Sequence, residues 1–95
     1  MDCVIWIQKG GLILRDVEIS LKALPNNLKS RLPAIVAYQN TTLNLTTCKI
    51  IGNPTGHNGG VILLNANAHI SDCEFYNLNG GCIYSIAKPY HTVTI

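Results

Sequence analysis

The segment Leu43-Asn44-Leu45-Thr46-Thr47-Cys48-Lys49-Ile50 decides the fold, because its apolar residues alternate, skip two positions and alternate again. Alternation with a period of two is typical of β-strands, and the two polar residues in the middle predict a bend between two short strands. The pattern recurs in two further copies and the start of a fourth: Leu12-x-Leu14-x-x-Val17-x-Ile19, Ala68-x-Ile70-x-x-Cys73-x-Phe75 and Val93-x-Ile95. The copies begin at residues 12, 43, 68 and 93, so they are 31, 25 and 25 residues apart, a period typical of stacked repeats.

A further strand is predicted seven positions before each full copy, at Ile5-x-Ile7, Val36-x-Tyr38 and Val61-x-Leu63. Three short strands in about 25 residues fit an all-β parallel β-helix solenoid, in which each strand pairs with its counterpart one coil away at about 4.8 Å. We expect about three to four coils in a single module spanning 1–95, with approximate bounds 4–33, 34–60, 61–81 and 82–95. Left-handed β-helices generally show a tight hexapeptide period, which this chain lacks, so a right-handed coil is expected.

Stacking of the coils predicts which side chains lie above one another. Three inward rows and one outward row are expected: Leu14, Leu45, Ile70 and Ile95; Val17, Cys48 and Cys73; Ile19, Ile50 and Phe75; and, outside, Glu18, Lys49 and Glu74. The outward row places a cation between two carboxylates, an arrangement that favours this register by roughly 0 to 1 kcal/mol per pair. Asn40 and Asn65 also occupy equivalent positions in their repeats.

The connection at 21–33 is the longest excursion and the most basic part of the chain, with Lys22, Lys29 and Arg31 close together. Loops that leave a solenoid commonly carry binding specificity. These three residues are therefore the candidate partner-binding loop. The simpler interpretation, which the notion of a protruding loop favours, is that their charges only solvate it.

The amino-acid composition limits the classes of protein to which the chain can belong. The 95 residues are 47% hydrophobic and 13% charged, which suits one domain of strands around a central core. A formal net charge of +2 without a basic stripe of stacking aromatics gives no indication of nucleic-acid binding. No apolar run is long enough to span a bilayer, and the start resembles no signal peptide, so an intracellular protein or an excised piece is expected.

Cysteine and histidine give no metal signature, since no pair has the spacing of a zinc site. Cys48 and Cys73 share an inward position, where reduced thiols acting as small hydrophobic side chains are expected and a disulfide across neighbouring coils is the alternative. No two of the histidines occupy equivalent positions in the repeat. All three, His57, His69 and His91, are expected to face solvent. We expect no metal-binding or cofactor-binding residues.

The segment 69–75, followed by Asn77 and by Gly80-Gly81-Cys82-Ile83, resembles a coil of the right-handed parallel β-helix superfamily, the pectate-lyase-like fold. This resemblance covers nearly the whole chain and carries no specific activity. The superfamily includes pectate lyases, polygalacturonases and non-enzymatic repeat modules of intracellular eukaryotic proteins, such as certain F-box proteins and ciliary or cytoskeletal scaffolds.

The residues favour the non-enzymatic branch. Hydrolysis of a glycosidic bond needs two positioned carboxyl groups, and Asp16 and Asp72 share a template position but lie two coils apart, about 9 to 10 Å. Gly56-His57-Asn58-Gly59 is similar to the Gly-His-Gly loop of such hydrolases but lacks the accompanying aspartate motifs. We therefore expect no enzyme and no catalytic residues.

A structural or scaffold module that mediates protein–protein interaction within a larger assembly is the leading hypothesis. Because the chain starts and stops inside the strand pattern, the module is expected to be part of a longer β-helix or to be completed by other subunits. A cytoplasmic, cytoskeletal or ciliary location is implied by the resemblance alone. The alternative is a carbohydrate-binding or carbohydrate-cleaving protein, which the sequence disfavours because Trp6, Tyr76, Tyr84 and Tyr90 do not recur at one template position.

Overall fold

The computed structural model describes residues 3–22, 32–86, 88 and 91–95, and this part of the chain is all-β. Its strands are short and contain two to five residues each. They are β1 (Ile5–Ile7), β2 (Gly11–Arg15), β3 (Glu18–Ser20), β4 (Ile35–Ala37), β5 (Thr42–Thr46), β6 (Lys49–Ile51), β7 (Val61–Leu64), β8 (Asn67–Ser71), β9 (Glu74–Tyr76), β10 (Ile83–Ile86) and β11 (Val93–Thr94). The described residues contain no helix.

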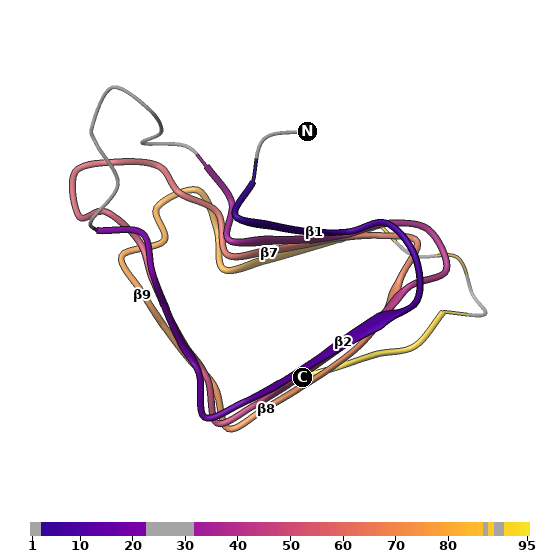
Figure 1. Ribbon diagram of the computed structural model, residues 1–95. Coiled ribbons are helices and arrows are strands. Elements are labelled where there is room, and N and C mark those ends of the chain that lie inside the picture. Colours follow the sequence, from indigo (N-terminus) through magenta and orange to yellow (C-terminus); the bar gives the residue numbers. More distant parts are fainter. Residues whose placement is uncertain (1–2, 23–31, 87, 89–90) are drawn as a thin grey trace.

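The strands form three parallel sheets, and the chain enters each sheet in turn before returning to the first (Figure 1). The first sheet has the order β1-β4-β7-β10, the second β2-β5-β8-β11 and the third β3-β6-β9. Every pairing joins a strand to the strand three places later. One passage through the sheets, which we call a tier, therefore lies directly on the next, and Figure 1 looks along the stack of tiers.

The register of the second and third sheets confirms the predicted rows. Leu12 pairs with Leu43, Leu43 with Ala68 and Ala68 with Val93. In the third sheet the inward row is Ile19, Ile50 and Phe75, and the outward row is Glu18, Lys49 and Glu74. Hydrogen bonds from Lys49 N to Val17 O (3.0 Å) and from Glu74 N to Cys48 O (2.9 Å) place the cysteine row as expected.

The predicted register of the first sheet is wrong by one residue in the second tier. Ile5 pairs with Ile35 and Ile7 with Ala37, so Val36 and Tyr38 are not the inward positions. The cause is a longer connection to β5, in which Thr41 N donates to Tyr38 O (3.1 Å) and Thr41 Oγ1 to the same oxygen (2.6 Å). This turn, in which only Thr41 is buried, absorbs one extra residue before Leu43.

Left-handed backbone residues form the corners of each tier. Asp16, Thr47 and Asp72, between the second and third strands, all have φ of 54°. Gly10, Asn40 and Asn65 take the left-handed conformation at the corner between the first and second strands. Asn40 and Asn65 coincide as predicted, joined by a backbone hydrogen bond of 2.9 Å from Asn40 N to Asn65 O.

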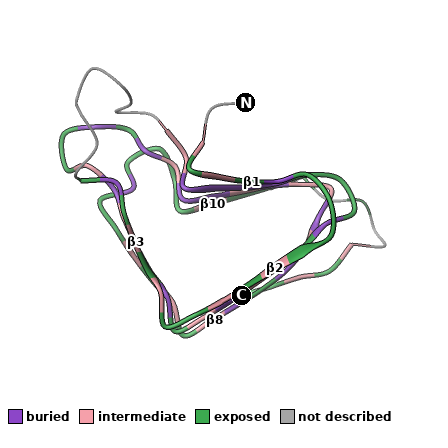
Figure 2. Ribbon diagram, viewed as in Figure 1, coloured by how far each residue is buried: buried purple, intermediate pink, exposed green. Residues whose placement is uncertain are grey.

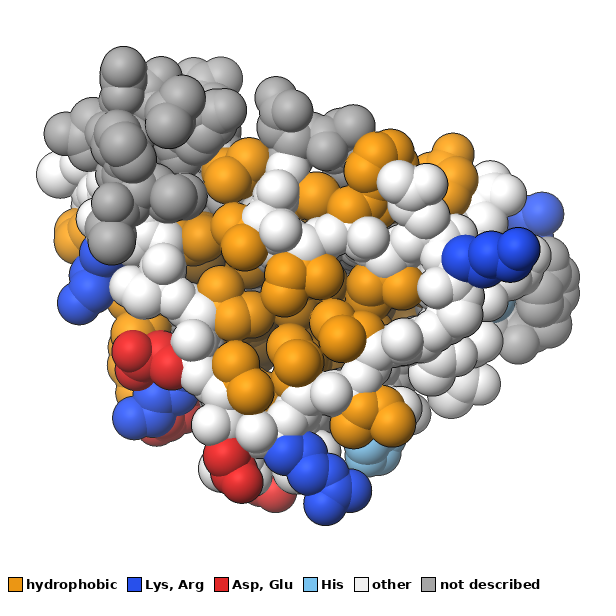
Figure 3. Space-filling view, in the orientation of Figure 1, with side chains coloured by type: hydrophobic (Ala, Val, Ile, Leu, Met, Phe, Trp, Pro, Cys, Tyr) orange, Lys and Arg blue, Asp and Glu red, His pale blue; other side chains and the backbone are white. Residues whose placement is uncertain are grey.

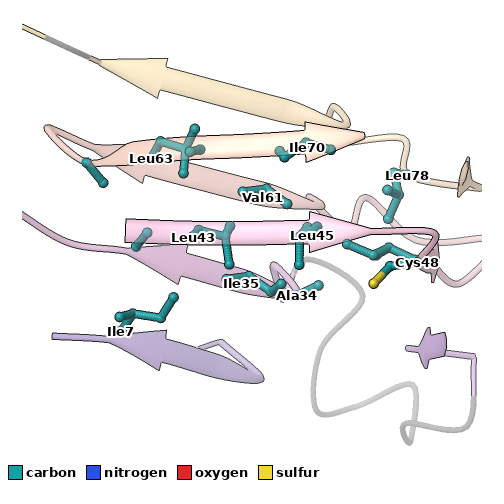
Figure 4. Close-up of a cluster of buried hydrophobic side chains, with 14 of the residues drawn as sticks. Ile7, Ala34, Ile35, Leu43, Leu45, Cys48, Val61, Leu63, Ile70 and Leu78 are labelled. Carbon is teal, nitrogen blue, oxygen red and sulfur yellow. The ribbon is translucent and has the colours of Figure 1, made fainter. Parts of the chain in front are cut away.

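The core lies between the three sheets, where aliphatic side chains from successive tiers fill the interior (Figure 4). Burial is deepest in the middle tiers: Leu43, Leu45, Ile35 and Leu63 have no exposed surface, whereas Leu12, Leu14, Val17 and Ile19 of the first tier are partly exposed. Figure 2 marks buried residues in purple and exposed ones in green around the stack. Figure 3 looks onto the first tier and shows the hydrophobic side chains gathered at its centre.

The cysteine row contains thiols. Cys48 is 2% exposed, and its Sγ lies 3.4 Å from the carbonyl oxygens of Leu14 and Thr46. Cys73 Sγ lies 3.3 Å from Ser71 O, and neither cysteine is in a disulfide. A weak S–H donor therefore finds a backbone acceptor at each position while the sulfur packs as a small hydrophobic group.

The connection between β6 and β7 is held by a buried amide. Asn58 has no exposed surface; its Oδ1 accepts from Asn53 N (2.8 Å) and its Nδ2 donates to Leu32 O (3.0 Å). Gly52 and Gly60 flank this connection, and a Cβ at either would collide with a backbone oxygen of the next tier, Asn77 O or Cys82 O. The backbone therefore approaches the next tier closely at both ends of this connection.

Thr47 gives a direct test of the corner. A β-branched residue in the left-handed region costs roughly 1 to 2 kcal/mol, whereas Asn adopts it readily. We expect Thr47→Asn to raise the free energy of unfolding by about 1 kcal/mol and the melting temperature by roughly 4–8 °C. Asp72→Thr, at the equivalent corner, should lower both by a similar amount.

Thermal and urea unfolding followed by circular dichroism measures both changes. Thr46→Asn is the matched control, because Thr46 is a strand residue in which Asn has no conformational advantage. Equal effects of Asn at positions 46 and 47 would contradict the corner assignment.

Candidate interaction surface

The outer face of the first sheet carries a row of apolar side chains. Because Ile5 and Ile7 point into the core, Trp6 between them points outward. The register places Trp6 next to Val36, then Ile62, then Tyr84. Val36 is buried but does not belong to the core cluster, as expected for an outward residue covered by its neighbours.

A second row runs beside the first, two residues further along the strands. Ile86 pairs with Leu64, and Tyr38 follows the pairing of Ala37 with Leu63. The two rows together make up the apolar face: Trp6, Val36, Tyr38, Ile62, Leu64, Tyr84 and Ile86. The face thus extends across all four strands of the first sheet.

Aromatic rings form the exposed part of the apolar face. Trp6 and Tyr38 are each 42% exposed and Tyr84 is 59% exposed. The rings of Trp6 and Tyr38 meet edge to face, with centroids 6.4 Å apart and an interplanar angle of 87°. This geometry is the preferred one for aromatic pairs, and it restrains both side chains in an exposed position.

The apolar face differs from the two other outer surfaces because its strands carry no charged residues. None of the residues in β1, β4, β7 and β10 is charged. The second sheet has Arg15 and His69 on its strands, and the third has Glu18, Lys49 and Glu74. An uncharged aromatic surface on a chain with two polar ones is the arrangement expected of a binding face.

The outer surface of the third sheet carries the row of Glu18, Lys49 and Glu74, which we call the charge row. Lys49 Nζ lies 3.6 Å from Glu74 Oε2, and both side chains are 52% exposed. A hydrogen bond from the Tyr76 hydroxyl to Glu74 raises the pKa of Tyr76 above 10.0, its ordinary value. Desolvation and the charge of Glu74 raise this pKa further, and the charge of Lys49 lowers it. The row favours the observed register but adds little stability, because exposed ion pairs contribute roughly 0 to 1 kcal/mol.

The predicted partner-binding loop is only partly described. Lys22 is an exposed residue in the turn that follows β3. Lys29 and Arg31 lie outside the described residues. Leu21, by contrast, belongs to the core: it is 2% exposed and its N–H donates to Ile51 O at 2.7 Å.

The remaining polar candidates lie apart. Asp16 and Asp72 occupy left-handed corner positions two tiers from one another, with Thr47 between them, so the backbone itself accounts for their residue type. His57 and His69 are exposed, and His91 Nε2 lies 3.3 Å from Asn40 Oδ1. Within residues 3–22, 32–86, 88 and 91–95, no group of three or more His, Cys, Asp or Glu side chains could hold a metal ion.

Sequence reasoning missed the aromatic row. Trp6 and Tyr84 were expected at different template positions, but they belong to one register row. The strand that carries Tyr84 was not predicted, because β10 begins at Ile83, ten residues before Val93, whereas Ile5 and Val61 lie seven residues before Leu12 and Ala68. The signal available was that each aromatic directly follows an isoleucine at the start of a short strand pattern, Ile5-Trp6 and Ile83-Tyr84.

Comparisons with protein-family models, with curated proteins and with solved structures found no match to this chain. In the described part of the chain, no helix is long and apolar enough to cross a membrane.

The pKa of Tyr76 tests the contact between this residue and Glu74, the last residue of the charge row. Replacing Glu74 with Gln removes the carboxylate that favours the protonated phenol, so we expect the pKa of Tyr76 to fall toward about 10. Glu18→Gln, at the other end of the row, should leave it unchanged. NMR titration of the Tyr76 ring resonances between pH 8 and 12 measures the shift, and an unchanged value in Glu74→Gln would refute the contact.

Proposed function

We propose that this chain is a structural module of the right-handed parallel β-helix type, which binds other proteins within a larger assembly through the apolar face. Three parallel sheets visited in turn, with each strand paired to the strand three places later, support the β-helix assignment. In a stacked architecture of this kind, binding surfaces are the flat outer faces and the loops. The proposal includes completion of the open tiers by other subunits or by further β-helix coils.

The single observation that carries the proposal is the composition of the apolar face. Trp and Tyr are enriched in protein interfaces, where they supply large contact areas at little cost in conformational entropy, and charged residues are depleted from interface centres. Here the aromatic side chains Trp6, Tyr38 and Tyr84 lie exposed on an uncharged sheet. Water contact with such a surface is unfavourable by about 25 cal/mol per Å² of apolar area, which a protein partner would remove.

Thiols at Cys48, Cys73 and Cys82 favour a reducing compartment for this function, because disulfides are rare in the cytosol. A cytoplasmic, cytoskeletal or ciliary setting is proposed on this ground and on the resemblance of the coils to non-enzymatic β-helix modules.

Carbohydrate binding is the second candidate function. It is favoured by the register row that contains both Trp6 and Tyr84, since recurring aromatics on one sheet could serve as platforms for sugar rings. Against it, recognition of a hydroxylated ligand needs several placed polar groups, and on the apolar face only the indole N–H and the two phenol hydroxyls can donate. Protein binding is therefore the better fit.

The test is the mass of the native particle that contains this chain. We expect the wild-type chain to be recovered by native mass spectrometry in a particle much heavier than 10.3 kDa. Trp6→Ser combined with Tyr84→Ser should release it, because each buried aromatic anchor contributes at least about 2 kcal/mol, or roughly 30-fold in affinity.

Ile13→Ser is the matched control, since Ile13 is an exposed apolar residue on the outer face of the second sheet. This variant should remain in the particle. Retention of the Trp6/Tyr84 variant in the particle would refute the protein-binding role of the apolar face. A wild-type monomer whose Trp6 fluorescence responds to glycans would support the second candidate instead.

A further inference from the structure

Charged side chains are segregated around the stack of tiers. The acidic residues of the described part are all exposed and lie at the corner between the second and third sheets or at the start of the third-sheet strands: Asp16, Asp72, Glu18 and Glu74. This corner lies across the interior from the first sheet (Figure 1), and Figure 3 shows the acidic side chains gathered at the lower left. The described acids are therefore kept away from the apolar face.

The corner between the first and second sheets is basic. Lys9 lies two residues after the end of β1, Lys88 lies two residues after the end of β10, and both are exposed. The second lysine is held at this corner by its backbone: Lys88 O accepts from His91 N (3.0 Å), and His91 Nε2 lies 3.3 Å from Asn40 Oδ1. We call Lys9 and Lys88 the basic margin of the apolar face.

The basic margin has no counter-charge within the described residues. The one ion pair there joins Lys49 to Glu74, on the third sheet. Electrostatic complementarity between a surface and its partner steers association and fixes orientation. A partner that covers the apolar face is thus expected to carry carboxylates where it meets the basic margin.

The backbone of the partner has to satisfy its own hydrogen bonds on this face. A sheet uses its backbone groups between strands, so its outer face offers side chains only. On the apolar face the polar groups are those of Trp6, Tyr38 and Tyr84. Burying unpaired N–H and C=O groups is costly, and an α-helix avoids that cost because it pairs its backbone internally. A helix is therefore better suited to this face than an extended segment.

The relief of the apolar face also suits a helix. Neighbouring strands are about 4.8 Å apart, so Trp6 on β1 and Tyr84 on β10 are about 14 Å apart, against a helix diameter of about 10–12 Å. Between these two rings lie the smaller side chains of Val36, which is buried, and Ile62, which is half-buried. A helix laid along the strands would contact both rings and the shallower centre.

We propose that the partner segment on the apolar face is an amphipathic α-helix whose acidic residues pair with Lys9 and Lys88. Its apolar stripe lies between the rings of Trp6 and Tyr84. The inference rests on the proposed function of this face and adds the chemistry of the partner. The described part of a second copy has no helix to supply, so the partner is a different protein.

An anionic membrane would present the same charge but fits the face less well. Basic segments that recognise anionic lipid typically cluster about four to eight lysine or arginine residues. The basic margin has Lys9 and Lys88 at one end of the face only. A membrane surface is therefore an outcome that the test must separate from the helix.

Zero-length cross-linking of the native particle tests the proposal. A carbodiimide joins a lysine amine to a neighbouring carboxyl group as an amide, and the reagent takes up the water that is lost and becomes a urea. Mass spectrometry then identifies both residues of each cross-link. We expect Lys9 and Lys88 to be joined to Asp or Glu of one partner segment whose apolar residues recur at i, i+3, i+4 and i+7.

Charge reversal measures what the basic margin contributes. We expect Lys9→Glu combined with Lys88→Glu to weaken retention in the particle about 10-fold, measured by native mass spectrometry after serial dilution. Both side chains are exposed and the contacts of Lys88 use backbone atoms, so the fold should persist. The matched control, Arg15→Glu combined with Lys22→Glu, changes the net charge equally at exposed positions off the face and should be retained as the wild type is.

Four outcomes would overturn the proposal. They are wild-type retention of the Lys9→Glu/Lys88→Glu variant, cross-links that avoid both lysines, a cross-linked segment with the alternating pattern of a strand, and sedimentation of the isolated chain with phosphatidylserine vesicles that this variant abolishes. The Trp6→Ser/Tyr84→Ser variant separates the two claims. Its release beside a retained lysine variant would leave protein binding by the apolar face intact and remove only the acidic helix, whereas its retention would remove both.

Discussion

The left-handed backbone at the corners is the constraint on which the rest of the structure depends. Asp16, Thr47 and Asp72 reverse the inward and outward sense of the chain at the same point of each tier, with the same φ of 54°. Since the side-chain period of a strand is two, a corner displaced by one residue would move every following side chain to the opposite face. Equal corners therefore fix which residues stack in the core and which form the outer surfaces.

The stack then gives each outer face its own chemistry. Side chains at equivalent positions of successive tiers form rows on the outside of each sheet. The chain therefore presents three distinct narrow surfaces. The first sheet presents aromatics without charge, and the third presents alternating charges. The core, by contrast, is uniform and aliphatic, and its inner tiers are closed by their neighbours. Stability thus depends on the inward residues, and the proposed recognition of partners depends on the outward ones.

Much of this arrangement could be predicted from the sequence. The copies at 12, 43 and 68 have regular alternation broken by a polar pair, and their rows were confirmed in both sheets that they form. The first sheet was harder, because 34–37 is apolar throughout and the turn at Thr41 adds a residue that no local pattern marks. The strand β10 begins ten residues before Val93 instead of seven, and this difference concealed the row shared by Trp6 and Tyr84, and with it the candidate binding face. The basic loop prediction rests on Lys29 and Arg31, outside the described residues.

Hydroxyl-radical footprinting of the chain, alone and within its native particle, is the most direct measurement of the central claim that the apolar face is the binding surface. Tyr38, Trp6 and Tyr76 have nearly equal exposure, 42%, 42% and 45%, but Tyr76 lies on the third sheet. The account predicts that oxidation of Trp6, Tyr38 and Tyr84 falls several-fold in the particle while that of Tyr76 stays the same. Unchanged oxidation of Trp6 and Tyr84 in the particle would contradict it.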